Sequence, residues 1–232
     1  MTSLRANLIE IIQLGSEIGG VLDLPVDHWP EPGQYLACQR LSSFSEILPV
    51  SLFAMPGSLD QLTLGPIPAD WLPSDQLAYS PPQGHGFSLP ISARRVGLVP
   101  LQVSPARLLP LADTALAQGA AVALFYASSL SSSMLSWVPS SVEILPVSTL
   151  LENPDWPDYL AFDVERATLE QVIDLVDLRI FQCSGDVLVR TPMPCRGLGK
   201  CGVCAVHTTR GWKYVCMDGP VFPITEVWHV AR

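Results

Sequence analysis

The amino-acid sequence predicts a multidomain α+β protein in three consecutive parts. These are a small antiparallel β-barrel (1–92), an α/β domain with a parallel sheet (93–182) and a compact C-terminal module (183–232). Three observations carry this prediction. Short apolar runs separated by turn residues fill the first part, and strand-like runs alternate with helical runs in the second. Five of the six cysteines lie in the third part.

The first part contains short apolar or alternating runs of strand length. Clusters of proline, glycine, aspartate and serine separate them, as at Pro81–Gly84. Short strands at this spacing are typical of a small antiparallel barrel. The expected strands are Leu8–Ile12, Gly20–Leu24, Gln34–Cys38, Val50–Ala54 and Gln76–Tyr79.

Strand-like and helical runs alternate in the second part, which implies a parallel sheet. One helix is expected over Leu108–Gln118, ended by Gly119. A second is expected over 169–176, because apolar residues recur there at helical spacing behind a capping box at Thr168–Gln171. The expected strands are Val96–Leu101, Ala120–Tyr126, Val142–Pro146 and Tyr159–Phe162, with Asp186–Thr191 opening the third part.

Composition and charge exclude several classes of partner. The formal net charge of −9 disfavours nucleic acid, which is also anionic. The longest apolar stretch, Ala120–Ala127, is too short to span a bilayer, so no membrane insertion is expected. Met1–Gly15 lacks the pattern of a secretory signal, and we expect a cytoplasmic location. The low share of charged residues, 15%, favours burial against a partner subunit in a hetero-oligomer.

Four cysteines in the third part follow a spacing of five, two and eleven intervening residues: Cys195, Cys201, Cys204 and Cys216. Thiolates are soft ligands that suit iron–sulfur clusters or zinc. The glycines between the first three would let the loop wrap closely around a cluster and leave backbone N–H groups free to point at sulfur. We therefore predict that these four cysteines bind a [2Fe–2S] cluster. Cys38 and Cys183 are expected to be small buried residues instead.

The alternative is a structural zinc site at the same cysteines, which would make the chain a non-enzymatic interaction protein. Zinc ribbons usually carry two Cys-x-x-Cys knuckles, whereas this chain has one. The plant-type ferredoxin spacing is Cys-x4-Cys-x2-Cys with a later fourth cysteine. The first gap here is one residue longer, so the spacing favours iron–sulfur without matching that pattern fully.

The residues around these cysteines resemble a known family. Met193–Cys195 and the stretch Cys216-Met-Asp-Gly-Pro-Val-Phe222 are similar to the iron–sulfur domain of the electron-transfer subunit of type B dihydroorotate dehydrogenase. Pro32–Leu36 resembles the Pro-Gly-Gln-Phe strand of that family's flavin-binding barrel. The resemblance implies a flavin-domain-like barrel, a ferredoxin-reductase-like α/β domain and a C-terminal [2Fe–2S] module, in this order.

The chain departs from that family at both nucleotide-cofactor sites. Leu48 stands where the family's barrel carries an arginine that meets the flavin pyrophosphate, and a leucine cannot replace that charged contact. The sequence therefore does not decide whether FAD is bound. Ser51 and Tyr35 are the candidate flavin contacts. Pro100–Arg107 stands where the family has a glycine-rich phosphate loop. Asp163 likewise replaces a cysteine beside the nicotinamide, so we expect that NAD is not bound.

Together these observations predict an electron-transfer iron–sulfur subunit that passes single electrons to or from a flavoenzyme or another redox protein. The resemblance implies a dihydroorotate dehydrogenase catalytic subunit as the partner, and hence a role in pyrimidine biosynthesis. We expect a redox subunit of an oxidoreductase complex, not a complete enzyme, and assign no catalytic residue. The third part carries six Lys/Arg and three Asp/Glu against seven and nineteen before it. Its cations, including Arg210 and Lys213, are therefore expected to face the partner.

Overall fold

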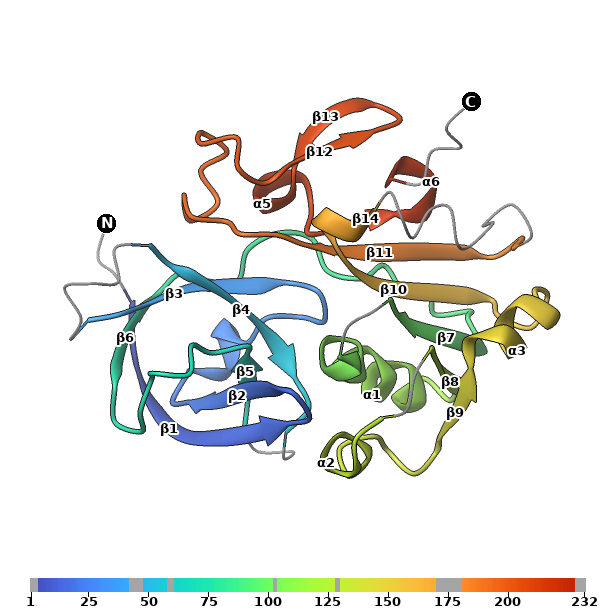
Figure 1. Cartoon of the computed structure of the whole chain (residues 1–232), viewed down its shortest axis with the longest axis horizontal. Helices are drawn as coiled ribbons and strands as arrows, with labels where there is room; N and C mark the ends of the chain where they lie inside the picture. Colours follow the sequence, from blue (N-terminus) through green and yellow to red (C-terminus); the bar gives the residue numbers. More distant parts are fainter. Residues whose placement is uncertain are drawn as a thin grey trace.

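The computed structural model describes residues 4–41, 48–57, 61–101, 104–127, 130–169 and 181–227. A closed barrel and a layered α/β body lie side by side in it, and the cysteine-rich region lies above them in the view of Figure 1. The predicted fold class, an antiparallel barrel beside an α/β body with a parallel sheet, is confirmed.

The barrel strands are β1 (Leu4–Leu14), β2 (Glu17–Leu22), β3 (Tyr35–Arg40), β4 (Val50–Met55), β5 (Thr63–Gly65) and β6 (Gln76–Tyr79). They close in the order β1-β2-β5-β4-β3-β6. The five predicted strands are present, whereas β5 was missed because its three residues are too few to show an alternating pattern. Large apolar side chains such as Leu36, Leu52 and Trp71 fill the interior, and Cys38 is buried among them as expected.

The sheet of the α/β body contains β7 (Arg95–Pro100), β8 (Ala121–Tyr126), β9 (Val142–Pro146), β10 (Tyr159–Glu165), β11 (Ser184–Arg190) and β14 (Val221–Pro223). Its order is β14-β11-β10-β7-β8-β9, and all pairs are parallel except β11 with β14. Helix α1 (Leu109–Ala117) buries Leu111, Ala112 and Ala115 against β7 and β8. This confirms the predicted parallel sheet and its first helix.

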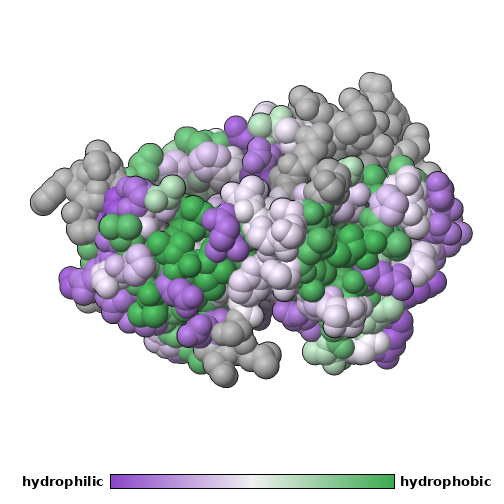
Figure 2. Space-filling model, turned by 60° about the horizontal axis from the view of Figure 1, so that its bottom comes forward, coloured by the Kyte–Doolittle hydropathy of each residue, from purple (hydrophilic) through white to green (hydrophobic). Residues whose placement is uncertain are grey.

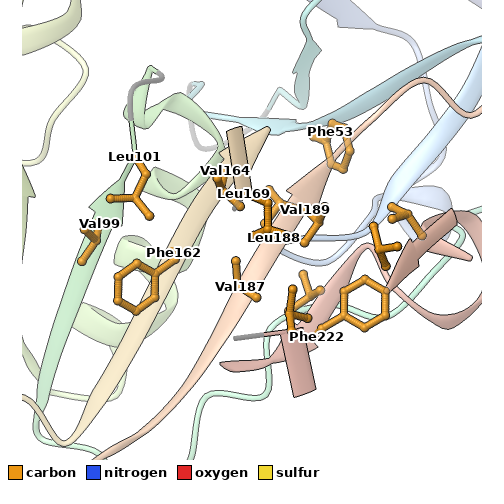
Figure 3. Packing of buried hydrophobic residues seen from close by; sticks show 14 of the residues in the cluster. Phe53, Val99, Leu101, Phe162, Val164, Leu169, Val187, Leu188, Val189 and Phe222 are labelled. Carbon is orange, nitrogen blue, oxygen red and sulfur yellow. The ribbon is translucent and has the colours of Figure 1, made fainter. Parts of the chain in front are cut away.

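Two strands from the predicted third part complete this sheet. Figure 3 shows Val187, Leu188 and Val189 of β11 in one hydrophobic cluster with Phe222 of β14 and Phe162 of β10. Phe53 of β4 belongs to the same cluster, so this core also joins the barrel to the sheet. The sheet therefore continues past residue 183, and the three-part division of the chain stays a prediction.

The remaining helices are short: α2 (Ser132–Leu135), α3 (Val147–Glu152), α5 (Val215–Asp218) and α6 (Ile224–Val227). The helix predicted over 169–176 lies outside the described residues from 170 onward. A 3-10 turn at Arg166–Thr168 directly precedes that segment, so only the start of the predicted capping box falls within the described part.

Apolar side chains are also exposed at the surface. The space-filling view shows them over both bodies, with polar residues between (Figure 2). Ile9 and Ile11 of β1 and Leu135 of α2 are among the exposed ones. Within the described ranges, no helix has the length and apolar composition needed to cross a bilayer.

Candidate iron–sulfur centre and neighbouring cleft

The four predicted ligands come from one loop and one hairpin above the barrel. Cys195, Cys201 and Cys204 lie on the loop between β11 and β12 (Ala205–Thr208). Cys216 lies on α5, directly after β13 (Gly211–Tyr214). The hairpin β12-β13 pairs Ala205 with Tyr214, and the N–H of Val215 donates to the carbonyl of Cys204 at 3.0 Å. The hairpin therefore brings together two cysteines that are distant in sequence.

The thiols are arranged as two pairs. A side-chain hydrogen bond joins Cys195 to Cys201, and another joins Cys204 to Cys216. Cys201 is exposed, Cys195 is half-buried, and the other two are buried. Within the described residues no group of three or more cysteine, histidine or acidic side chains converges on a single metal ion. The arrangement is thus one of two thiol pairs, and Cys183 belongs to neither.

Backbone N–H groups of the loop point at these sulfurs. Burial opposes ionisation of Cys195, but hydrogen bonds from the N–H groups of Lys200, Leu198 and Cys201 lower its pKa to about 6. Burial and the neighbouring Cys204 raise the pKa of Cys216 to about 12, although the N–H of Gly199 donates to its sulfur. The N–H groups of the loop therefore stabilise thiolates by hydrogen bonding, as they would in a loop that binds an iron–sulfur cluster.

Two loop glycines have a backbone conformation that other residues rarely adopt. Gly197 and Gly199 have φ angles of +77° and +62°, in the left-handed region that favours glycine. A Cβ on Gly199 would collide with the sulfur of Met217, and one on Gly197 would lie 2.8 Å from Oε1 of Gln83. Four thiols, N–H donors and a closely wrapped backbone form a donor set that fits an iron–sulfur cluster.

A cleft of about 620 Å³ lies between the barrel and the α/β body. Ser51, one of the two candidate flavin contacts, lines it. The other candidate, Tyr35, is not one of the described lining residues; it is fully buried, and its hydroxyl donates to the carbonyl of Cys216. The barrel wall is Leu48–Ser51, Phe53 and Pro66, and the facing wall is Glu165–Ala167 and Arg190–Pro194.

The cleft has an apolar barrel wall and a more polar facing wall. Its volume is in the usual range for small-ligand sites, and its barrel wall is apolar apart from Ser51. The two arginines on the facing wall have partners within the chain, but Nη2 of Arg190 and the hydroxyl of Thr191 on the same wall are buried without a hydrogen-bond partner among the described residues. Arg190 binds Asp163 and Glu165, and Arg166 donates to the carbonyls of Val203 and Ala205.

A buried ion-pair network occupies the place of the missing phosphate loop. Arg107 is 1% exposed and binds Asp163 at 3.1 Å and Glu17 at 2.7 Å. Burial alone would lower the pKa of Arg107, but the charges of Asp163 and Glu17 raise it. Ligands of open α/β sheets bind outside the carboxyl ends of the strands. Asp163 and Arg107 fill that position, so these residues do not fit a dinucleotide.

Sequence reasoning missed this network. Glu17, Arg107 and Asp163 are far apart in the chain, and each is an ordinary charged residue in its local segment. The sequence signals were the loss of glycine at Pro100–Arg107 and the aspartate at 163. They indicated that a nucleotide is no longer bound but not that these residues bind each other.

The two cations expected to face a partner share one internal carboxylate. Arg210 and Lys213 bind Glu226 at 3.2 and 3.0 Å, and the Glu226 side chain is almost fully buried. Their positive charge is therefore partly cancelled, which weakens the expected role of these two residues as free docking cations. Trp212 between them is 73% exposed and makes an edge contact with His207.

Fold and site together define a protein with a ferredoxin-reductase-like fold and a C-terminal cysteine-rich region whose donor set fits an iron–sulfur cluster. Residues 191–228 match the family model described as the iron-sulfur cluster binding domain of dihydroorotate dehydrogenase B. Sulfhydrogenase 1 subunit gamma of Pyrococcus furiosus (strain ATCC 43587 / DSM 3638 / JCM 8422 / Vc1) is 49% identical over 41 residues. That stretch spans 18% of this chain and 14% of the relative's length.

Solved structures resemble the chain over a much greater length. The structure of an NADH-dependent reduced ferredoxin-NADP oxidoreductase covers 98% of this chain and 91% of its own, with a TM-score of 0.74 at 16% identity. A ferredoxin reductase in carbazole 1,9a-dioxygenase covers 75% of this chain and 64% of its own, with a TM-score of 0.57 at 13% identity. A ferredoxin NADP+ reductase from Neisseria gonorrhoeae with bound FAD and NADP covers 82% of this chain and 98% of its own, with a TM-score of 0.56 at 11% identity. These similarities establish the fold.

Residues 191–228 are thus similar to the iron–sulfur cluster binding domain of dihydroorotate dehydrogenase B, and this similarity supports an iron–sulfur cluster as the cofactor of the chain.

Proposed function

We propose that this chain is the electron-transfer subunit of a flavin-linked oxidoreductase, with a [2Fe–2S] cluster on Cys195, Cys201, Cys204 and Cys216. The observation that carries the proposal is the pairing of the thiols. A cluster with two irons needs two thiolates on each, and the four cysteines lie as two hydrogen-bonded pairs. We therefore assign Cys195 and Cys201 to one iron and Cys204 and Cys216 to the other.

One-electron transfer is the chemistry that such a cluster would supply, which suits a link between a two-electron flavin and a one-electron partner. The chain's own residues provide a short connection to the cleft. Arg190–Pro194 form one cleft wall, and Pro194 is bonded directly to Cys195. A flavin ring held in the cleft beside Ser51 would lie next to this segment. We propose that Ser51 contacts such a ring and that any flavin is held mainly through its ring.

The surface around Cys201 suits contact with a protein partner. Leu198, Val203 and Met217 are exposed close to it in sequence or contact, and Trp212 is exposed on the adjoining hairpin. Exposed aromatic and apolar residues are typical of interface centres. We propose that this face meets a flavoenzyme catalytic subunit in a cytoplasmic hetero-oligomer. A dihydroorotate dehydrogenase catalytic subunit, and so pyrimidine biosynthesis, is the assignment that the family match of residues 191–228 favours.

The domain boundaries are part of the same proposal. The barrel (1–92) would present a flavin, the α/β body (93–182) would act as a scaffold without nicotinamide, and 183–232 would carry the cluster. The pairing of β11 with β10 supports a rigid connection between the last two.

Metal and flavin analysis of anaerobically purified protein tests the function. We expect two irons and two sulfides per chain, with visible absorption that dithionite bleaches. A colourless protein with stoichiometric zinc would instead establish the structural-zinc interaction protein. The partner is tested separately: a dihydroorotate dehydrogenase catalytic subunit should co-purify with the chain and reduce its cluster when given dihydroorotate. A cluster-loaded chain that neither binds nor is reduced by that subunit would rule out this partner alone.

A further inference from the structure

The hydroxyl of Tyr35 links the barrel to the cysteine-rich region. It donates a hydrogen bond of 3.1 Å to the carbonyl oxygen of Cys216, which is 181 residues away in the chain. Tyr35 has no exposed surface, and its ring packs against Phe53 with 6.1 Å between centroids. The hydroxyl is therefore fixed in place by packing and directed at one backbone atom of a proposed ligand residue.

Gln83 supports the first cysteine in the same way. Tyr35 and Gln83 exchange backbone hydrogen bonds of 3.2 and 2.9 Å, which holds them side by side. The Gln83 side-chain amide donates to the carbonyl of Arg196, the residue after Cys195, at 3.4 Å. Tyr35 and Gln83 are also the nearest contacts of Gly197, so they form the floor beneath the tightest part of the loop.

A third contact continues along the same barrel segment. The N–H of His85 donates to the carbonyl of Gly219 at 2.7 Å, and its ring lies 3.1 Å from the carbonyl of Asp218. Residues of this segment thus contact the backbone of Arg196, which follows Cys195, and the backbone of Cys216, Asp218 and Gly219. These contacts are not needed to close the barrel, because β3 already pairs with β4 and β6.

The buried hydroxyl of Tyr35, which donates to the carbonyl of a proposed ligand residue, affects the electrostatic potential at the cluster site. The positive end of its O–H dipole faces the cluster region, where the low dielectric of the interior strengthens the interaction. Reduction adds a negative charge to a cluster, so such a dipole favours the reduced form. Hydrogen bonding and burial around a cluster are among the factors that set its reduction potential.

We infer that Tyr35, with Gln83 beside it, is a positioning residue that fixes the cysteine loops on the barrel and raises the reduction potential of the cluster. The inference rests on the proposed function. It gives the barrel a role in the cluster site that does not depend on whether a flavin is retained.

The test is a redox titration of the cluster-loaded chain, followed by visible absorption. Tyr35→Phe keeps the ring and removes only the hydroxyl. We expect the reduced-to-oxidised ratio at a fixed potential to fall at least threefold, which is about 28 mV for a one-electron couple. Tyr79→Phe is the matched control: it removes another barrel hydroxyl, which bonds His28 instead of the cysteine region, and should leave the potential unchanged.

An unchanged or more positive potential in Tyr35→Phe would overturn the inference. Loss of the cluster from Tyr35→Phe with a melting curve equal to that of Tyr79→Phe would support it. If Tyr35→Phe does not fold, Gln83→Leu is measured instead. Removing the hydrogen bond from Gln83 to Arg196 should also make the reduction potential more negative. An unchanged potential in Gln83→Leu would overturn the inference. The iron and sulfide content of the wild-type chain tests the proposed function separately. A wild-type chain without iron and sulfide would contradict the proposed function before any variant is compared.

Discussion

Arg107 of the α/β body binds Glu17 of the barrel through both carboxylate oxygens, with N–O distances from 2.7 to 2.9 Å. The same guanidinium binds Asp163 at the end of β10, so one arginine ties the barrel to the sheet. This pair stands where related folds bind a nucleotide phosphate at a strand end. The positive charge of Arg107 is thus neutralised by two carboxylates of the same chain.

The first prediction concerns this buried pair. Arg107→Met should lower the free energy of unfolding by about 3–5 kcal/mol, because it leaves a fully buried Asp163 and a largely buried Glu17 with one cation fewer. Denaturant unfolding measures the change. Arg95→Met is the control, since it breaks an exposed pair with Asp158 and should have little effect. Equal losses in the two variants would show that the network does not hold the two bodies together.

The second prediction concerns the cluster ligands. Serine at Cys201 or Cys204 should abolish the visible absorption and the bound iron, because each substitution removes one thiol of a different pair. Cys38→Ser should leave the absorption intact, since Cys38 lies inside the barrel. Iron analysis after anaerobic purification checks both. Bleaching by Cys183→Ser but not by Cys195→Ser would mean that the first ligand has been assigned wrongly.

The third prediction concerns nicotinamide nucleotides. NADH should show no binding in the micromolar range by isothermal titration, because Arg107 and Asp163 fill the crevice at the strand ends and bind each other. Micromolar affinity would contradict the assignment of this network as the replacement for a ligand.

The fourth prediction concerns flavin. FAD should be held loosely and lost on dilution, since Leu48 lines the cleft and the described barrel wall offers no guanidinium for its phosphates. Leu48→Arg should tighten FAD by roughly tenfold, as expected for a hydrogen bond to a charged group. Riboflavin, which has no phosphate, should bind equally to both forms and serves as the control in a fluorescence titration. Stoichiometric FAD that survives dialysis of the wild-type chain would show that another group binds the pyrophosphate.

The fifth prediction concerns acid stability. Hydrogen bonds from Arg95 and from the N–H groups of Arg94 and Arg95 hold the pKa of Asp158 below its usual value. A carboxylate with a depressed folded-state pKa stabilises the fold above its unfolded pKa of ~3.9, and this contribution is lost as the pH falls through the lower folded value. Asp158→Asn should therefore be slightly less stable than wild type at neutral pH, because the pair with Arg95 is exposed, and the difference should narrow below about pH 4. Urea unfolding across that pH range measures it, and a difference that does not change with pH would contradict the prediction.

The local features of this protein follow from its sequence. Alternating apolar runs predicted five of the barrel strands, and the alternation of strands with a helix predicted the parallel sheet, because both patterns are repeated within a few residues. The spacing of Cys201 and Cys204 in a glycine-rich loop indicated the cluster site for the same reason. The stretch from Cys216 to Phe222 carried the family resemblance.

Only the tertiary structure decided how these local features are joined. Tyr35 was a candidate flavin contact from its position in the strand, but its hydroxyl meets Cys216 because the cysteine loops pack on the barrel. Arg210 and Lys213 were expected to face a partner, and the structure shows that both also bind Glu226. The bonds of Arg107 to Glu17 and Asp163 left no pattern at all, because a charged side chain finds its partner through space, while a sequence pattern records only neighbours along the chain.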